Sequence, residues 1–318
     1  MPGPAITGSD LAQRLGLVGV DLDEETGIAA RYFADPGNGP SGLAAQAAVP
    51  ALAQAGVSVE DLGMLIFATT TPDVAFPGSA CFLQHRLDAP TVGALDIRAQ
   101  AAGFLAALDM AEGFCGDADA APVLVAAGEV FSAGLDFSES GRELASRLGD
   151  GAVVAIVARG DQGPKLLTSR WYTDGTLVES FWTDAPHSAQ VPIRISLEDL
   201  AAGRHYPQAD LPSLRALAQE RLVAVLQEVA AETAMAPTEA ACVIVDYVEP
   251  AVALAAAQEL GIALERLSIP SAQFAHVMTA GLGIDLTRRL DGLASGSRVL
   301  MASAGPGFTW GAAVIEVD

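Results

Sequence analysis

Residues 94–108 read ALDIRAQAAGFLAAL, a pattern that predicts a buried strand, a sharp turn and a helix rich in Ala and Leu. Turns of this kind often hold a nucleophile, because a strained turn exposes its side chain at the positive end of the following helix. The position of that nucleophile is occupied by Ala101, whose methyl group cannot attack a carbonyl carbon. The segment therefore predicts a site for covalent catalysis whose reactive atom is missing.

The composition of the chain limits its partners. Its 318 residues are 51% hydrophobic, which is enough for a large core or two coupled half-domains. The net charge of −22 argues against a nucleic-acid partner, since phosphates need a basic surface. The same charge hinders docking of an acidic carrier protein unless a local basic patch exists, although it can also serve only for solubility.

Segments that would indicate a membrane, a secretory route or a metal site are not found in the sequence. No run of 18 uncharged apolar residues is present, and the first ten residues, MPGPAITGSD, lack the basic and apolar regions of a signal peptide. Cys81, Cys115 and Cys242 do not have the spacing of metal ligands, and three is an odd number for a disulfide framework. We therefore expect a cytoplasmic protein with reduced thiols, no metal and no membrane partner.

Strand-like and helix-like segments alternate along the chain. In the first half, strands are expected at 62–71, 92–97, 121–130 and 151–160, and helices at 77–87 and 101–114. In the second half, strands are expected at 165–173 and 241–250, helices at 211–234 and 251–261, and a strand, Gly-rich turn and strand at 298–317. The alternation predicts parallel sheets covered by helices, in two similar halves, residues 1–160 and 161–318. Residues 183–210 show little periodicity and are expected to form a loop insertion that shapes a substrate entrance.

Six segments together resemble β-ketoacyl-ACP synthase III-like proteins of the thiolase superfamily. In chain order they are TGIAAR, ATTTPDVAFPGSACFLQHRL, ALDIRAQAAGF, GEVFSAGLDFSES, LGDGAVVAIV and ASAGPGFTWGAAV. The resemblance covers nearly the whole chain. It implies an α/β fold of the thiolase-like layered αβαβα type with two similar halves, assembled as a homodimer. It also implies no cofactor, with acyl-CoA or an acyl-carrier thioester as the substrate.

The resemblance places Ala101 where the family has its nucleophilic Cys. Three explanations stay open: a Cys→Ala change made to trap a substrate, a naturally inactive homologue that serves as a partner subunit, or an enzyme that transfers the acyl group directly. We favour the first, because Asp96, Gly103 and Phe104 of the family's elbow are all retained.

The family's other two catalytic positions, a His and an Asn that support decarboxylation and condensation, are occupied by Asp246 and His276. An ionised Asp would oppose the negative charge of the enolate that forms as CO₂ leaves. A carboxylate next to an imidazole instead orients it, stabilises its cation and raises its basicity. The resemblance thus points to a small branch of synthase III-like acyltransferases, which move acyl groups such as malonyl onto hydroxyls in natural-product biosynthesis.

In this interpretation His276 deprotonates an alcohol or amine acceptor and Asp246 orients the imidazole, in a form of the protein that carries Cys at position 101. Decarboxylative carbon–carbon condensation, as in the parent family, is one alternative, and a non-catalytic partner subunit is another. A purely structural pair, in which Asp246 caps the next helix and His276 is a core histidine, also remains open.

The resemblance further assigns Gly305, Gly307 and Phe308 of the C-terminal Gly-rich turn to substrate binding. Pro306 falls where the family has a backbone N–H for the oxyanion, and proline has none, so the Gly307 N–H or the His276 side chain would have to replace it. The family's carrier-docking Arg is missing from PAVALAAA, residues 250–257. Docking of a carrier would then need basic residues clustered at the entrance, among which we consider Arg142, Arg147 and Arg204.

Other polar residues near these motifs are weaker candidates. Gln100 lies one position before the nucleophile, so we expect it to pack or form hydrogen bonds. Cys81 is expected to be a buried structural cysteine and His85 to lie on a helix surface. His187 and His205 fall in the insertion, where ordinary surface roles are favoured over contact with substrate.

Overall fold

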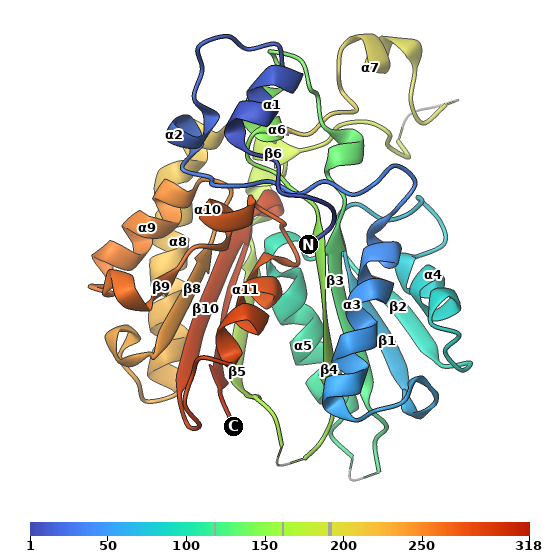
Figure 1. Ribbon diagram of the computed structural model, residues 1–318, viewed down its shortest axis with the longest axis vertical. Helices are drawn as coiled ribbons and strands as arrows, with labels where there is room; N and C mark the ends of the chain where they lie inside the picture. Colours follow the sequence, from blue (N-terminus) through green and yellow to red (C-terminus); the bar gives the residue numbers. More distant parts are fainter. Residues whose placement is uncertain (118, 161, 190–192) are drawn as a thin grey trace.

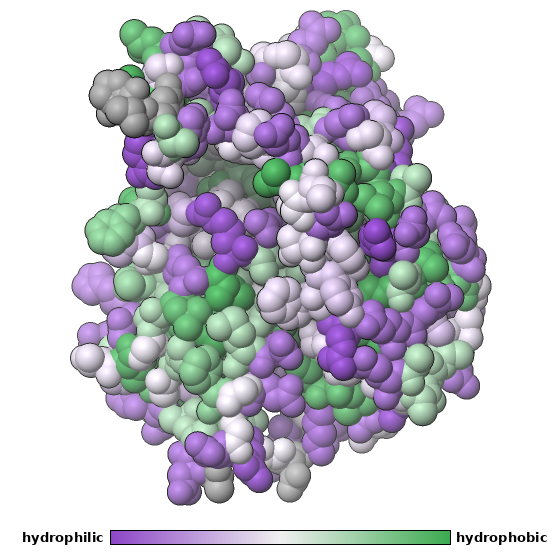
Figure 2. Space-filling view, turned by 180° about the vertical axis from the view of Figure 1, so that it is seen from behind, coloured by the Kyte–Doolittle hydropathy of each residue, from purple (hydrophilic) through white to green (hydrophobic). Residues whose placement is uncertain are grey.

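A computed structural model describes residues 1–117, 119–160, 162–189 and 193–318. Two β-sheets form the body of the molecule, and helices lie between them and on their outer faces (Figure 1). Hydrophilic residues are spread over the face seen in Figure 2, with apolar areas between them. None of the helices in the described part of the chain is long and apolar enough to cross a membrane.

The first sheet has the strand order β2-β1-β3-β4. Strand β1 is parallel to β2 and to β3, whereas β4 is antiparallel to β3. The expectation of an all-parallel sheet is therefore wrong for β4. The segment 130–150 stays at the edge where β3 ends, so β4 runs back instead of crossing over. The strands are β1 Met64–Ala68, β2 Gly93–Ile97, β3 Val123–Glu129 and β4 Gly151–Val157.

The second sheet has the order β5-β11-β10-β8-β9, and it too is mixed. Strand β8 is parallel to β10 and β9, while β11 is antiparallel to both β10 and β5. The tight turn at 306–308 between β10 and β11 makes that pair a hairpin, so it cannot be parallel. The strands are β5 Lys165–Thr173, β8 Cys242–Asp246, β9 Leu267–Ser268, β10 Arg298–Gly305 and β11 Thr309–Glu316.

The helices complete an αβαβα arrangement of the thiolase type. Helices α5 and α11 contact strands of both sheets and form the middle layer. Helices α3 and α4 cover the outer face of the first sheet, and α8 and α9 cover that of the second. The bounds of these helices are α3 Pro40–Ala55, α4 Ser79–Arg86, α5 Gly103–Phe114, α8 Leu211–Glu232, α9 Pro250–Glu259 and α11 Gly281–Leu290.

Short elements surround one end of the two sheets. The insertion at 183–210 holds helix α7 and strand β7, and β7 pairs with β6 directly before the insertion, so the segment is less irregular than its sequence predicts. The remaining short elements are α1 Gly8–Arg14, α2 Leu22–Thr26, α6 Arg142–Ala145, β6 Phe181–Trp182, α7 Leu197–Ala201, β7 Gln208–Ala209 and α10 Pro270–Phe274.

Small residues allow the middle layer to pack closely. A methyl group at Gly283 of α11 would lie 2.7 Å from Val153 of β4 and 2.9 Å from the ring of Phe104 on α5. A methyl group at Gly103 would lie 2.8 Å from the Thr279 side chain. Both distances are too short for a Cβ, so these glycines permit the approach that brings the two halves of the chain together.

Candidate active site

The predicted elbow is present at the edge of the first sheet. Strand β2 ends at Ile97, a 3₁₀ turn spans Gln100–Ala102, and α5 begins at Gly103. The strained residue is Gln100, whose φ of +45° lies in the left-handed region that non-glycine residues rarely adopt. Ala101 follows directly and is 1% exposed. The backbone strain expected of a nucleophile turn is therefore retained, one residue before the position that would carry the nucleophile.

Asp96, which we noted as part of the retained elbow, has a structural role. Its carboxylate accepts hydrogen bonds from the backbone N–H groups of Ser79 at 2.6 Å and Ala80 at 2.7 Å. These groups are at the start of α4, where N–H groups lack partners within the helix and a negative charge is favoured. Asp96 thus joins the end of β2 to α4 and fixes where the elbow begins.

Asp246 and His276, thirty positions apart, form a buried pair. Asp246 is the last residue of β8, and both side chains are 0% exposed. His276 Nδ1 lies 3.0 Å from Asp246 Oδ2, and Asp246 Oδ1 accepts a hydrogen bond from the Ser271 N–H at 3.1 Å. With Nδ1–H donated to the carboxylate, the neutral imidazole carries its lone pair on Nε2. That Nε2 atom is buried without a hydrogen-bond partner in the described part of the chain.

The backbone of His276 is held by the other half of the molecule. Its N–H donates to the carbonyl of Arg147 at 2.8 Å, and its carbonyl accepts from the N–H of Gly149 at 3.1 Å. The preceding residue, Ala275, has a φ of +64°, in the left-handed region. A strained residue and two hydrogen bonds from residues far along the chain therefore set the orientation of the imidazole.

Glu129 ties the segment after His276 to the first sheet. It is fully buried at the end of β3, and its carboxylate accepts hydrogen bonds from the hydroxyls of Thr70, Thr71 and Thr279 at 2.9, 2.7 and 2.9 Å. Burial raises the pKa of Glu129 above its ordinary value, against the opposing effect of these donors. Thr279 also packs next to Gly103 at the start of α5, so it links the elbow with the His276 segment.

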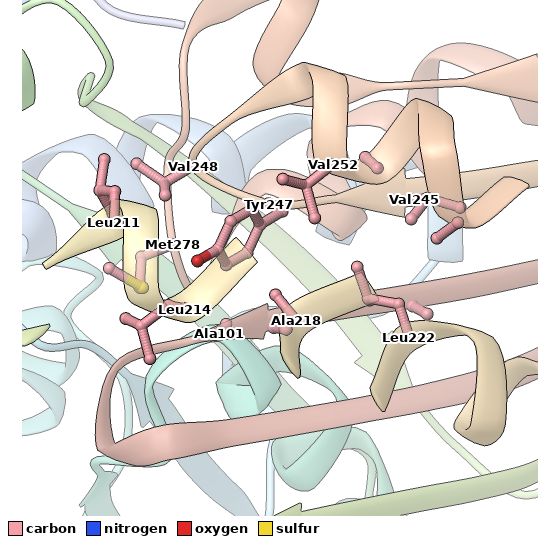
Figure 3. Close-up of a cluster of buried hydrophobic side chains, with 14 of the residues drawn as sticks. Ala101, Leu211, Leu214, Ala218, Leu222, Val245, Tyr247, Val248, Val252 and Met278 are labelled. Atoms are coloured by element: carbon pink, nitrogen blue, oxygen red, sulfur yellow. The ribbon is translucent and has the colours of Figure 1, made fainter. Parts of the chain in front are cut away.

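The surroundings of Ala101 are apolar (Figure 3). Ala101 belongs to a buried cluster with Met278, Leu211 and Leu214, which lie after His276 and at the start of α8. A methyl group built on Gly305 would lie 2.9 Å from Ala101 Cβ and 3.2 Å from Met278 Sδ. The elbow, the Gly-rich turn and the His276 segment therefore meet at position 101. That His276 Nε2 faces Ala101 stays a prediction.

The three candidate residues of the Gly-rich turn differ in their surroundings. Gly305 lies against Ala101, as described above. Gly307 has a φ of +114° and is close to the side chain of Gln100, so the turn also contacts the strained residue of the elbow. Phe308 is buried, and its N–H donates to the carbonyl of Asp174 at 3.0 Å. Roles of these residues in substrate binding stay predictions.

The structure corrects one cysteine assignment and locates the other candidates. Cys81 is exposed, not buried, because its position on α4 turns away from the first sheet while Ala80 and Leu83 face it. His85 is exposed on the same helix, as expected. His187 and His205 are half-buried in the insertion, where the rings of His205 and Tyr206 lie 3.9 Å apart. No metal-binding group of His, Cys, Asp and Glu occurs in the residues described.

The candidate basic residues are engaged locally. Arg142 pairs with Glu25 at 3.3 Å, and Arg204 pairs with Asp199 at 3.1 Å. Arg147 is buried and donates to the backbone carbonyl of Glu143 at 2.8 Å. A basic docking patch built from these residues therefore stays a prediction.

Tyr247, Thr279 and Glu129 were not identified as site residues from the sequence. Tyr247 directly follows Asp246 at the end of a predicted strand, and polar residues at strand ends often line a site. The position of Tyr247 at the end of a strand could therefore have marked it as a site residue. Nothing in the sequence indicated that Thr279 and Glu129 are bonded to each other, because 150 positions separate them.

Comparisons with known proteins show the family of this chain. A family model of 3-oxoacyl-[acyl-carrier-protein] synthase III matches residues 95–175, and the model of its C-terminal region matches residues 230–317. The β-ketoacyl-[acyl-carrier-protein] synthase III of Sphingopyxis alaskensis is 30% identical, over 100% of this chain and 96% of the relative. The chain belongs to the β-ketoacyl-[acyl-carrier-protein] synthase III family.

Solved structures of synthase III proteins share the fold. The synthase III of Aquifex aeolicus is 29% identical, with a TM-score of 0.86 over 99% of this chain and 96% of that one. The Pseudomonas aeruginosa protein has a TM-score of 0.87 over 100% of this chain and 95% of that one, at 23% identity, which shows the fold alone. The family and the thiolase-like fold predicted from the sequence are thus confirmed.

Proposed function

We propose that this synthase III homologue moves an acyl group, such as malonyl, from a thioester to a hydroxyl or amine acceptor in natural-product biosynthesis. The observation that carries the proposal is the buried Asp246–His276 pair, with Nδ1 bonded to the carboxylate and Nε2 unpartnered in the described residues. This is the arrangement of a general base held in one tautomer.

The reaction has two halves in a form of the protein that carries Cys at position 101. His276 Nε2 takes the proton of the Cys thiol, and the resulting thiolate attacks the thioester carbonyl. The C–S bond to the donor breaks, and the imidazolium gives its proton to the departing donor sulfur, which leaves as a free thiol. His276 Nε2 then takes the proton of an acceptor O–H or N–H as that atom attacks the acyl carbon. The bond to the residue-101 sulfur breaks, and the imidazolium returns its proton to that sulfur.

Two other functions remain candidates. Decarboxylative condensation is favoured by the named activity of the relatives, which are β-ketoacyl-[acyl-carrier-protein] synthases. Against it, an ionised Asp246 at one of the family's catalytic positions would oppose the negative charge of an enolate. A non-catalytic partner subunit is favoured by Ala101, which has no reactive atom. Direct transfer, in which His276 activates an acceptor that attacks the bound thioester itself, also needs no thiol.

For the donor, acyl-CoA fits the proposal better than an acyl carrier protein, since the net charge is −22 and Arg142 and Arg204 are already paired.

We also propose a homodimer. Strand β2 lies at the free end of the first sheet with partly exposed residues, and nearby Phe76 is 88% exposed. Light scattering of the purified chain would give its molar mass. The three free cysteines accord with a cytoplasmic location, which we include in the proposal.

The test uses the Ala101→Cys variant and malonyl-CoA or propionyl-CoA. Because Cys81 is exposed and could be acylated itself, both the variant and the parent chain should also carry Cys81→Ser. Covalent acyl transfer predicts a mass increase that maps to position 101, and loss of that mass when a panel of small alcohols and amines is added. Absence of a mass increase at position 101 would contradict the covalent mechanism. CO₂ release with a carbon–carbon product would favour condensation, and transfer by the parent chain would favour the direct route.

A further inference from the structure

Tyr247 is a large buried side chain whose hydroxyl group has no hydrogen-bond partner among the described residues. It follows Asp246 directly, at the end of β8, and is 0% exposed. Its hydroxyl oxygen has no hydrogen-bond partner in the described part of the chain. Leaving a buried O–H unpaired is unfavourable, and nearly all buried polar groups in proteins are hydrogen-bonded. A buried hydroxyl without a partner in the described residues is a donor that an oxygen of a bound molecule would satisfy.

Tyr247 and Ala101 belong to the same buried apolar cluster. The ring packs among Leu214, Val248 and Met278, and the hydroxyl points toward Met278 (Figure 3). Met278 Sδ and Ala101 Cβ both lie against the Gly305 backbone, since a methyl group there would be 3.2 and 2.9 Å from them. The phenol thus belongs to the same cluster as the position at which an acyl group would be held, and the other side chains labelled in Figure 3 are apolar.

The phenol is a neutral donor under ordinary conditions. Burial raises the pKa of Tyr247 well above its usual value, and the nearby Glu249 carboxylate raises it further. Arg215, whose charge lowers the pKa of Tyr247, is held by Glu249 through two hydrogen bonds of 2.8 and 3.1 Å to Oε1 and one of 3.0 Å to Oε2. A neutral O–H in an apolar surrounding donates a strong hydrogen bond to any oxygen that enters.

We propose that the Tyr247 hydroxyl donates a hydrogen bond to an oxygen of the acyl group bound at position 101. The inference rests on the proposed acyl transfer, since it requires that an acyl thioester enters this cluster. An acyl thioester carries a carbonyl oxygen, and groups such as malonyl carry further oxygens along the chain. Either oxygen could accept the hydrogen bond from the Tyr247 hydroxyl. A comparison of propionyl-CoA with malonyl-CoA distinguishes the thioester carbonyl from an oxygen farther along the acyl chain.

The experiment measures binding of propionyl-CoA and malonyl-CoA by calorimetry to the chain as it stands, where Ala101 leaves the thioester intact. Tyr247→Phe removes only the hydroxyl. Loss of one neutral hydrogen bond should weaken binding about 3- to 10-fold. If the thioester carbonyl is the acceptor, both ligands lose affinity and the infrared band of a ¹³C-labelled thioester carbonyl shifts to higher frequency. If a farther oxygen is the acceptor, only malonyl-CoA loses affinity.

The control is Tyr172→Phe, which removes a surface hydroxyl that donates to Glu228 at 2.6 Å and should leave both affinities unchanged. Thermal unfolding of Tyr247→Phe gives a second readout. If the hydroxyl forms its hydrogen bond only with a bound ligand, it is unpaired in the free protein. Removing it should then leave the midpoint temperature of unfolding unchanged or raise it. Unchanged affinity for both ligands, or a lowered midpoint, would overturn the role of Tyr247 alone. Failure of the unsubstituted chain to bind either ligand would contradict the proposed function itself.

Discussion

The substitution Asp246→Asn tests the proposed general base most directly. It keeps the size of the side chain but removes the charge that faces His276 Nδ1 at 3.0 Å. When His276 takes a proton, the imidazolium gains an attraction to the carboxylate. At this separation and an effective dielectric constant of about 20, that attraction is about 5 kcal/mol. Because each 1.36 kcal/mol changes a rate tenfold, the upper limit of the loss is about 10⁴-fold. An Asn oxygen that still accepts from Nδ1–H recovers part of this energy, so we expect a loss between about 10² and 10⁴-fold.

The assay follows the second half-reaction alone. The Ala101→Cys variant, which also carries Cys81→Ser, is acylated with propionyl-CoA and freed of excess donor. Mass spectrometry then follows its loss of the acyl group to water or to added alcohols. The matched control is Asp285→Asn, which removes another fully buried carboxylate, one bonded to Gln273 at 3.4 Å. The control should deacylate at a rate within about threefold of the parent, as for a site away from the chemistry. Equal deacylation rates in the Asp246→Asn and parent proteins would refute the general-base argument, because the imidazole would then act without its carboxylate.

Two further predictions concern the groups that hold the pair in place. Gly281→Ala should reduce the deacylation rate at least about tenfold, because the new methyl group would overlap Asp246 Oδ2. The control Gly292→Ala adds a methyl group with ordinary contacts and should leave the rate unchanged. A normal rate in Gly281→Ala would show that the position of the carboxylate is not critical. Glu129→Gln should flatten the pH dependence of stability. The raised pKa means that the folded protein holds this proton more tightly than the unfolded chain, so the free energy of unfolding should fall as pH rises from about the ordinary value of 4.5 through the raised pKa. Urea denaturation at several pH values measures this slope, and an unchanged slope in the Gln variant would contradict the assignment.

The elements of the fold could largely be predicted because their signals are local. The strands at β1, β3 and β8 are short apolar runs, and the helix at α8 is a long segment between a Pro-containing start and a polar end. The direction of β4 could not be read in this way. The direction of β4 depends on the path of the connecting segment 130–150, and no local sequence pattern indicates that path. The burial of Cys81 was mispredicted for a similar reason, since a helix of mixed composition does not show which side faces the sheet.

The sequence alone determined the elbow, the family and the identities of the residues that stand at its three catalytic positions. These depend on residue types in a fixed order along the chain, which a one-dimensional pattern preserves. Only the tertiary structure decided that His276 Nδ1 reaches Asp246 and that the imidazole is oriented by the backbone of Arg147 and Gly149. It also placed Tyr247, whose hydroxyl has no hydrogen-bond partner in the described residues, in the same buried cluster as Ala101. Hydrogen bonds and burial depend on distances of a few ångströms between segments far apart in sequence, and those distances are set by the packing of the two sheets around α5 and α11.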